Sequence, residues 1–402
     1  MKILTALLLT FLFTLSNCCL NGQDEVRVKE LEEIIGKNGK DITTLDALIE
    51  IMEKQLQGNV SLVKNYGYKA VILARELNQK EQEVRAYYIM AEAFFIAHQF
   101  DSLKILVDKG REILSDEKTN PALWGVLNHV ESAMYTKEGK FTLADELLRQ
   151  SQRIFTMVGD ECELGSTLYR IGALAFSNNN YDSAIYYFIE ANKKYTICGD
   201  SAQIAKVYSN TSKCYINLKD YQQALSNCLK AERIYTRFKK KKSEANNFNI
   251  LGQIYVMINK FDSAYYYFNK SIALFDSIGL LKSQGAHIYI NIGNIFFAKE
   301  DYDKAFEYFS LANRMATEIN DPHQIVSTIK NLAVTYERRG EYDKALKMYD
   351  TCLMIEKKYE LNHKMILTYF NIYRTWALKG DYKKAYEYQE IYNSWKDSVY
   401  NL

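Results

Sequence analysis

One short pattern recurs along this chain at a nearly constant distance. It consists of an aromatic residue, two mostly polar residues and a small or apolar residue, as in Tyr181-Asp182-Ser183-Ala184. Successive copies are separated by steps of 41, 40, 40, 40, 41, 40 and 40 residues. Such a period predicts one continuous array of stacked repeats instead of separate globular domains. The aromatic residues of the pattern are Phe100, Phe141, Tyr181, Tyr221, Phe261, Tyr302, Tyr342 and Tyr382.

Each repeat predicts two antiparallel helices. After Tyr181, apolar residues follow at offsets of three, seven, ten and fourteen, which places them on one face of a helix. In the first seven repeats a second small residue stands twelve positions before the small residue of the pattern, so the paired helices can approach closely. A degenerate helix pair is expected over 41–83. Eight repeats are expected over 84–402, starting near residues 84, 125, 165, 205, 245, 286, 326 and 366.

Glycine and proline mark the expected helix ends. Gly159, Gly199 and Gly279 stand between repeats, where a helix can end in the left-handed conformation that glycine enters without a clash. The chain has two prolines, Pro121 and Pro322, at the same phase of the repeat. Each follows a capping residue, which predicts the first helical position, where no N–H donor is needed.

The repeats resemble the tetratricopeptide repeat. Leu251-Gly252-Gln253-Ile254-Tyr255 followed by Ala264-Tyr265-Tyr266-Tyr267-Phe268 is similar to its pattern L-G-x-x-Y then A-x-x-x-F. The period of forty residues exceeds the usual value of about thirty-four and resembles long-helix variants. In the last repeat Tyr373 replaces the small residue. The resemblance implies an all-α, right-handed α-solenoid of about eight to nine antiparallel helix pairs, with the first helices lining a concave groove.

The N-terminus predicts export. The apolar stretch from Ile3 to Leu15 is too short to span a membrane as a helix, so residues 1–19 are interpreted as a signal peptide and residues 20–40 as a linker. Leu15-Ser16-Asn17-Cys18 resembles a lipoprotein box, which implies lipidation at Cys18. Lipidation, simple cleavage and an uncleaved anchor are the three alternatives. The expected location is the periplasm or the membrane surface facing it.

Composition and motifs argue against nucleic-acid binding and catalysis. Lysine and arginine number 51 against 49 acidic residues, so the net charge of +2 gives no reason to expect nucleic acid as a partner. The five histidines are scattered, without an H-E-x-x-H motif, and there is no C-x-x-C pair. Glycines occur singly and form no phosphate-binding loop. We therefore expect no catalytic residue, no metal, no cofactor and no enzymatic role.

Five cysteines follow the N-terminal pair. They show no regular spacing, so the sequence predicts no disulfide framework, even in an oxidising compartment. Buried thiols are the expected state, because some of these residues replace small residues on the packing face. The five are Cys162, Cys198, Cys214, Cys228 and Cys352.

Polar residues on the first helices are the candidate ligand-binding residues. An asparagine recurs two residues before the small residue of the first helix, a position that the resemblance places in the groove. A side-chain amide can pair with both the N–H and the C=O of an extended peptide. The alternative is that these amides bond to neighbouring helices or face water. The candidates are Asn210, Lys213, Asn217, Asn249, Gln253, Asn291, Asn294, Lys330, Asn331, Arg338, Asn371 and Arg374.

Two further observations bear on this groove. Val334 stands where the chaperone-tail clamp of such repeats would have an asparagine, which argues against that clamp. Core packing is the expected role of most aromatic residues, although Phe95, Phe176 and Phe297 could face the groove.

The last helix resembles the exit from the periplasmic repeat array of bacterial membrane-bound sensors. It carries Tyr386, Ile391 and Trp395 on an apolar face that we expect to be partly exposed, so that either a partner covers it or the fold frays there. We therefore expect an exported protein- or peptide-binding module, as a stand-alone or truncated sensor input domain. The alternative is a structural or assembly scaffold lipoprotein of a cell-envelope complex. A third class, an enzyme acting on envelope polymers, would require paired carboxylates in the groove.

Overall fold

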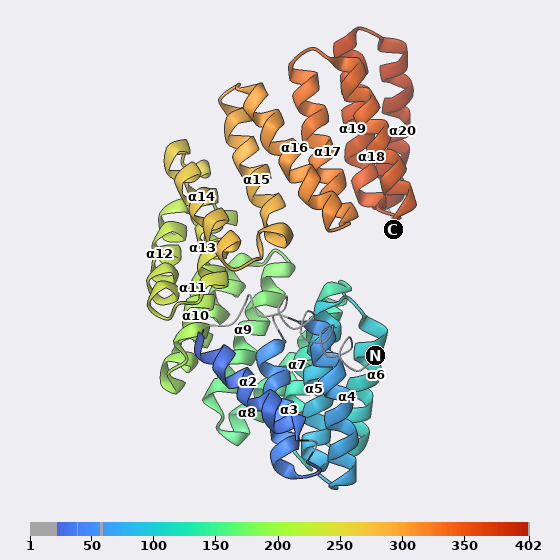
Figure 1. Ribbon diagram of the computed structural model, residues 1–402. Helices are drawn as coiled ribbons and strands as arrows, with labels where there is room; N and C mark the ends of the chain where they lie inside the picture. The colour runs from blue at the N-terminus through green and yellow to red at the C-terminus, as the bar shows by residue number, and fades with distance from the viewer. Residues whose placement is uncertain (1–21, 38, 57–58, 401–402) are drawn as a thin grey trace, which may run out of the picture. The chain divides into compact units, whose positions relative to one another are not determined.

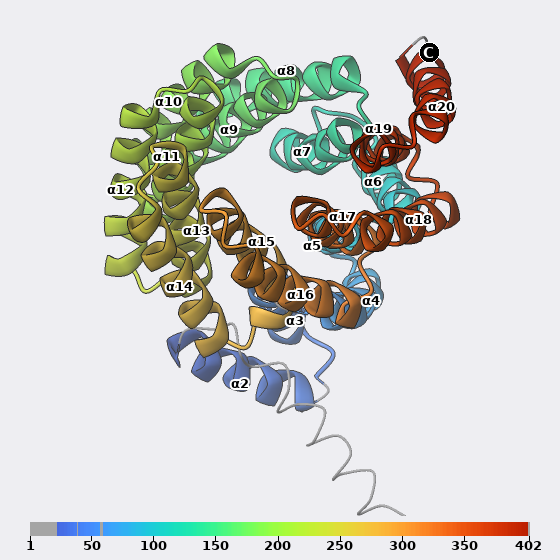
Figure 2. The ribbon, with the colours of Figure 1, turned by 90° about the horizontal axis from the view of Figure 1, so that it is seen from above.

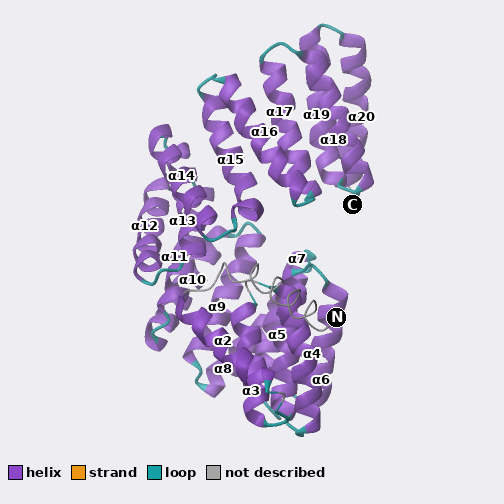
Figure 3. Ribbon diagram, in the orientation of Figure 1, coloured by secondary structure: helices purple, strands orange, loops and turns teal. Residues whose placement is uncertain are grey.

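The chain folds as stacked α-helices. The computed structural model describes residues 22–37, 39–56 and 59–400, and every regular element within these ranges is a helix (Figures 1 and 3). Consecutive helices pack as antiparallel pairs, which confirms the predicted all-α solenoid. Contacts divide the chain between Ser243 and Glu244 into two compact units.

The first unit holds the helices up to α12. Their lengths of 14 to 18 residues follow from the repeat, because each forty-residue period must accommodate two helices and two short turns. The helices are α2 (Gly22–Gly36), α3 (Ile42–Gln55), α4 (Val60–Glu76), α5 (Lys80–Ile96), α6 (Phe100–Leu114), α7 (Pro121–Lys137), α8 (Phe141–Val158), α9 (Glu161–Ser177), α10 (Tyr181–Cys198), α11 (Ser201–Asn217) and α12 (Tyr221–Arg237).

Helix α2 lies where a linker was predicted, so that prediction was wrong for residues 22–36. Val28 and Leu31 are buried and belong to the core around α3, and the partly buried Ile35 packs against the same core. These three residues have the i, i+3, i+7 spacing of a helical face. The Arg27 guanidinium also binds both carboxylate oxygens of Glu50 on α3, at 2.9 and 2.7 Å.

The second unit holds the remaining helix pairs, and α13 begins just before its boundary. In α20, the predicted exposure of the apolar face is confirmed for Tyr386 and Ile391, which are 63% and 38% exposed. The Trp395 ring instead packs against Tyr369 of α19, with ring centroids 6.3 Å apart. The helices are α13 (Lys241–Met257), α14 (Phe261–Ser277), α15 (Leu281–Ala298), α16 (Tyr302–Glu318), α17 (Pro322–Arg338), α18 (Tyr342–Lys358), α19 (Asn362–Lys379) and α20 (Tyr382–Tyr400).

The small residues of the repeat make room for a phenylalanine of the partner helix. A Cβ atom added at Gly252 would lie 2.4 Å from the Phe268 ring, and one at Gly293 would lie 2.5 Å from the Phe309 ring. Both rings are fully buried. The spacing of twelve residues between the two small positions, which recurs in the first seven repeats, therefore allows the backbone of one helix to approach an aromatic ring of the other. Interiors packed this tightly do not tolerate an added methyl group easily.

A second small residue on the second helices forms a hydrogen bond to the first helix. The Ser151 hydroxyl donates to the Gly125 carbonyl at 3.0 Å, and the Ser271 hydroxyl donates to the Ala245 carbonyl at 2.7 Å. Cys352 occupies the corresponding position in α18, where its Sγ lies 3.7 Å from the carbonyl oxygen of Val326. This contact explains why a cysteine fits the packing face there.

The predicted helix ends are confirmed. Gly159 and Gly199 both have a φ of +76°, and Gly279 has a φ of +67°, in the left-handed region that favours glycine. Pro121 and Pro322 are the first residues of α7 and α17. In each case the side chain of the preceding residue caps the helix by accepting a backbone N–H bond at 3.1 Å.

Two cysteines form a disulfide, so the expectation of buried thiols was wrong for them. Cys162 is the second residue of α9 and Cys198 is the last residue of α10. The two helices are antiparallel, so the start of one lies beside the end of the other, and the Cα atoms are 5.7 Å apart. Such a separation suits a disulfide. Cys214, Cys228 and Cys352 are buried thiols, as expected.

The N-terminal signal and Cys18 lie outside the described residues. Within the part of the chain that the structure describes, no helix is both long and apolar enough to cross a membrane.

Candidate functional site

The candidate ligand-binding residues lie on the first helices of the pairs. In the first unit, α7, α9 and α11 form an inner layer and α8, α10 and α12 an outer layer (Figure 2). Contacts also run directly between first helices, from α5 to α7 and from α7 to α9. Side chains at equivalent positions of these helices therefore line a common surface.

Arg170 of α9 is a groove residue that the sequence analysis did not name. It stands two residues before Gly172, which is the position that Asn210 occupies in the next repeat. Its Nη2 lies 3.5 Å from the Glu92 carboxylate on α5, and its Nη1 lies 3.5 Å from the His129 carbonyl oxygen on α7. The repeat period was a sufficient signal for this residue, but only amides had been sought at that position.

The predicted residues of α11 form a hydrogen-bonded chain. Asn210 donates from Nδ2 to the Tyr169 hydroxyl at 2.6 Å, and Lys213 Nζ donates to Asn210 Oδ1 at 3.1 Å. Asn217 donates to the Lys213 backbone carbonyl at 2.8 Å. The amides therefore do bond to neighbouring groups, as the alternative interpretation expected. These bonds fix the direction of the Asn210 amide and leave one of its two N–H donors unused.

A lysine beside this chain is electrostatically strained. The Lys206 Nζ lies 4.5 Å from the centroid of the Tyr169 ring. Lys206 is exposed as a whole, but desolvation of its ammonium group over this ring, with repulsion from Arg170, lowers the pKa of Lys206 to about 8. Burial also raises the pKa of the Tyr169 hydroxyl, which stays protonated. The surface around Arg170 therefore carries two cationic side chains close enough to repel one another.

In the second unit an amide pair joins two first helices. Asn291 of α15 donates from Nδ2 to Oδ1 of Asn249 on α13 at 3.1 Å. Asn249 and Asn371 are buried, Asn331 is half-buried and Asn294 is exposed. Among the described residues, four of the predicted amides make no side-chain hydrogen bond, namely Gln253, Asn294, Asn331 and Asn371.

Two predicted cations of the second unit are committed to ion pairs. Lys330 is buried, and its Nζ lies 2.8 Å from Oε1 of the fully buried Glu356. Arg374 binds both carboxylate oxygens of the buried Glu337, at 2.9 and 3.1 Å. Lys330 therefore offers no free charge to a ligand. Arg338 is different, because it is exposed and lies over the Phe297 ring at 5.8 Å.

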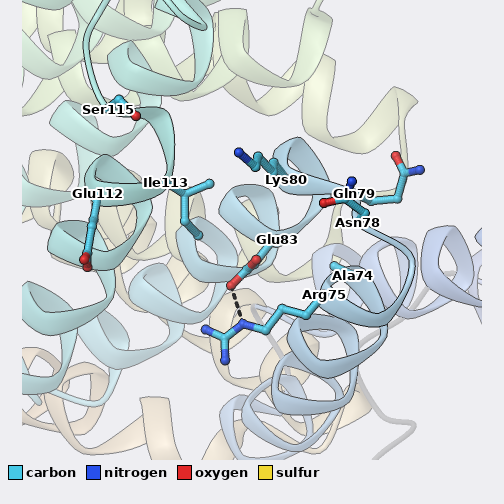
Figure 4. Close-up of a pocket in the computed structure, with 9 residues that line it drawn as sticks. All are labelled: Ala74, Arg75, Asn78, Gln79, Lys80, Glu83, Glu112, Ile113 and Ser115. Atoms are coloured by element: carbon cyan, nitrogen blue, oxygen red, sulfur yellow. Dashed lines mark hydrogen bonds and ion pairs between the residues drawn. The ribbon is translucent and has the colours of Figure 1, made fainter.

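Two cavities of the first unit lie away from the groove positions. One of about 320 Å³ is lined by residues of α4, α5 and α6 (Figure 4). There the Arg75 guanidinium binds Glu83 at 2.7 Å and the Tyr87 hydroxyl at 2.6 Å, so these charged groups are paired. Another of about 590 Å³ lies between α8, α9 and α10, where the Arg149 guanidinium covers the Tyr187 ring.

A third cavity of about 240 Å³ lies between α5, α7 and α9, at the groove positions. Its lining includes Arg170 and Tyr169 of α9 and Phe95 of α5, which places Phe95 at the groove. Among the described residues, no cluster of three or more histidine, cysteine or acidic side chains could hold a metal ion. The chemistry on this face is hydrogen bonding, charge pairing and apolar contact, which are the means of recognition.

Comparison with known proteins agrees with this architecture. The family model described as tetratricopeptide repeat matches residues 203–277 and 286–358. These two segments therefore match tetratricopeptide repeats (TPRs). The TPR resemblance seen in the sequence is thereby confirmed over these residues. No curated protein matches the chain significantly in sequence.

Solved structures with the same fold include three of clear similarity. A Rap protein complexed with competence and sporulation factor has a TM-score of 0.58 at 14% identity, covering 89% of this chain and 99% of its own. A signal-transduction ATPase with a TPR sensor, from Pyrococcus horikoshii, has a TM-score of 0.57 at 15% identity, and the match covers 87% of this chain and 55% of the ATPase. NprR in complex with its cognate peptide NprX has a TM-score of 0.51 at 16% identity, covering 72% and 85%.

Proposed function

We propose that this chain is an exported TPR module that binds an extended peptide or protein segment along its first helices, as the input domain of a sensor. One observation carries the proposal: hydrogen-bonding side chains recur at the same position of successive first helices. They are Arg170 and Asn210 in the first unit and Asn291, Asn331 and Asn371 in the second, and only α13 between them differs, with Ile250 at this position and Asn249 beside it. Amides spaced in this way can bind the backbone of an extended chain whatever its sequence.

The structural relatives support this function at the level of the fold. NprR was solved with a peptide, and the Pyrococcus horikoshii protein uses TPRs as a sensor. The TPR fold is typically a non-catalytic interaction scaffold. We propose the same for this chain, because the polar groups of its groove are arranged for binding.

Export is supported by the disulfide together with the N-terminal sequence. Disulfides persist in oxidising compartments and are rare where thiols are kept reduced. The bond between Cys162 and Cys198 is therefore the state expected after passage across the inner membrane. A lipid anchor at Cys18 belongs to the same proposal and accounts for the cysteine that follows the apolar N-terminal stretch.

An assembly scaffold is the second candidate function. The exposed apolar side chains Tyr386 and Ile391 on α20 favour it, because such a surface is commonly covered by a partner. A scaffold would copurify with one partner in a fixed ratio, whereas a sensor input domain would bind a ligand that dissociates.

Selection from a random-peptide phage library against the purified full chain tests the peptide groove. Selected peptides should bind the wild type and lose affinity for the double variant Asn291→Ala/Asn331→Ala. Each lost amide contact should weaken binding by about 1 kcal/mol. The matched control is Asn269→Ala, since Asn269 is exposed on α14. Equal binding of the selected peptides to the wild type and the double variant would remove the amides from the site.

Thiol trapping in intact cells tests export. A maleimide reagent added during lysis should label neither Cys162 nor Cys198 in the wild type. Deletion of residues 1–19 should leave both thiols reduced and labelled. Labelling of both residues in the wild type would contradict export.

A further inference from the structure

The groove cavity of the first unit exists because two successive repeats carry alanine at one position. Ala133 of α7 and Ala173 of α9 directly follow the small residue of their helices. Four of the five later repeats have a larger polar side chain at this position, namely Lys213, Gln253, Asn294 and Arg374, and the fifth has Val334. Two missing long side chains, from helices that contact each other, leave the space of about 240 Å³.

Part of the lining of this cavity is apolar. Leu148 of α8 and Leu174 of α9, both buried, line it together with the two alanines. The half-buried Phe95 contributes from α5. A cavity of roughly 150 Å³ lined by such residues can hold benzene, so this one has room for a phenylalanine, leucine or methionine side chain.

The rim of the cavity is cationic. Arg170 and the exposed Lys137 both line it, and Lys206 lies over the Tyr169 ring that forms one wall. The acidic groups that interact with Arg170 here are Glu92 and Glu163. The Lys206 ammonium also interacts with Asp200, so three cations and three carboxylates surround the cavity, and a further negative charge would need free donors.

Arg170 has hydrogen-bonding capacity left for that charge. A guanidinium carries five N–H donors. The two contacts that Arg170 makes, to Glu92 and to the His129 carbonyl, are both at 3.5 Å, which is the outer limit of a hydrogen bond. A carboxylate could accept two shorter, parallel bonds from the same group.

We infer that this cavity holds a large apolar side chain of a bound peptide while Arg170 binds the carboxylate of an adjacent aspartate or glutamate. The inference rests on the proposed peptide-binding function and adds to it the chemistry of the preferred sequence. It is a pocket for internal peptide side chains, and both recognition elements come from the first unit.

A labelled peptide tests the pocket directly. The probe is an acetylated and amidated Gly/Ser peptide that carries one Phe-Asp pair, and its binding to the full chain is measured by fluorescence anisotropy. Replacing Asp by Asn should weaken binding about tenfold, the factor expected when a charge-assisted contact is lost. Replacing Phe by Ser should weaken it about tenfold as well, because the burial of apolar surface is lost. Peptides with a free C-terminal carboxylate should gain nothing.

Two protein variants complete the test. Arg170→Gln should abolish the preference for Asp over Asn. Ala173→Gln should abolish the preference for Phe over Ser, because it fills the cavity with the side chain that a later repeat carries at this position. The matched control for the lost charge is Arg153→Gln, since Arg153 is exposed on the outer helix α8.

The outcomes separate this inference from the function on which it rests. If all versions of the probe bind the wild type equally, and Arg170→Gln changes nothing, the pocket is refuted while peptide binding stands. If neither the probe nor any library peptide binds, both are refuted. Unchanged circular dichroism of each variant excludes loss of the fold as the cause.

Discussion

Cys162 and Cys198 join the second residue of α9 to the last residue of α10, across 36 positions of sequence. Closing a loop of this length restricts the unfolded chain and should stabilise the fold by about 3–4 kcal/mol. Cys198→Ser should therefore lower the free energy of unfolding by that amount in urea titrations without reductant. Reductant should destabilise the wild type to the same degree and leave the variant unchanged. A variant that reductant destabilises further would show that another bond is responsible.

Gly252 lies directly against the Phe268 ring, so Gly252→Ala should destabilise the second unit. The added Cβ would lie 2.4 Å from the ring, and overpacking of this kind costs about 1–3 kcal/mol. Chemical denaturation measures the loss. Phe268→Leu in the same chain should relieve the clash, so the double variant should be more stable than the sum of the two single losses predicts. Strictly additive losses would contradict a direct contact.

Substitution of Lys330 tests whether this residue stabilises the fold or binds a ligand. Its removal in Lys330→Met would leave the buried Glu356 carboxylate unpaired, with hydrogen bonds from the Thr368 hydroxyl alone. The expected loss of stability is about 3–5 kcal/mol. Lys330→Met/Glu356→Leu should recover most of it, as measured by thermal unfolding. If Lys330→Met lost peptide binding at unchanged stability, Lys330 would instead be a ligand-binding residue.

Because His129 is buried, we expect the folded protein to lose stability in acid. The histidine is fully buried, its Nε2 lies 2.7 Å from the Thr167 hydroxyl, and burial with the nearby Arg170 holds its pKa well below the usual value. An unfolded histidine has a pKa of about 6.5. Below that pH the unfolded state therefore takes up a proton that the folded state does not, and stability falls.

The variant His129→Gln isolates this contribution. Its free energy of unfolding, measured from about pH 8 to about pH 5, should fall less than that of the wild type. Other groups near the ring, such as Glu163 at 3.8 Å from Nδ1, are present in both proteins and cancel in the comparison. Parallel curves for the two proteins would show that His129 is protonated in the folded state.

Much of the fold could be predicted because the repeat encodes its own geometry. The period located the helix pairs, and single residues such as Gly159 and Pro121 located helix ends. Helix α2 was missed because it lies outside the period, and its apolar residues stand among many charged ones in a segment that was interpreted as a linker. The disulfide was missed although its spacing of 36 residues carries a signal. Because the two helices of a repeat are antiparallel, the start of the first helix lies beside the end of the second, so two cysteines with this spacing can be joined.

The candidate site was less predictable than the fold. The repeat period gives the place of a residue on its own helix, but it does not show which residue of another helix it contacts. Lys330 and Arg338 looked equivalent as cations, yet only Lys330 finds a buried glutamate within reach. Arg170 lay at a predicted position, but its use depends on Glu92, which is 78 residues away. The cavity beside it results from two alanines, and small residues at a repeat position do not by themselves indicate a binding site in a sequence.

Helix α2 also has a consequence for symmetry. Filaments of repeat proteins grow when the last pair of one copy docks on the first pair of the next, a heterologous contact that does not close. Here α2 occupies the apolar face of α3 and turns charged residues such as Glu30 and Glu33 outward. This prevents α20 of one copy from docking on α3 of the next. A contact between the exposed α20 faces of two copies would instead be isologous and would stop at two copies.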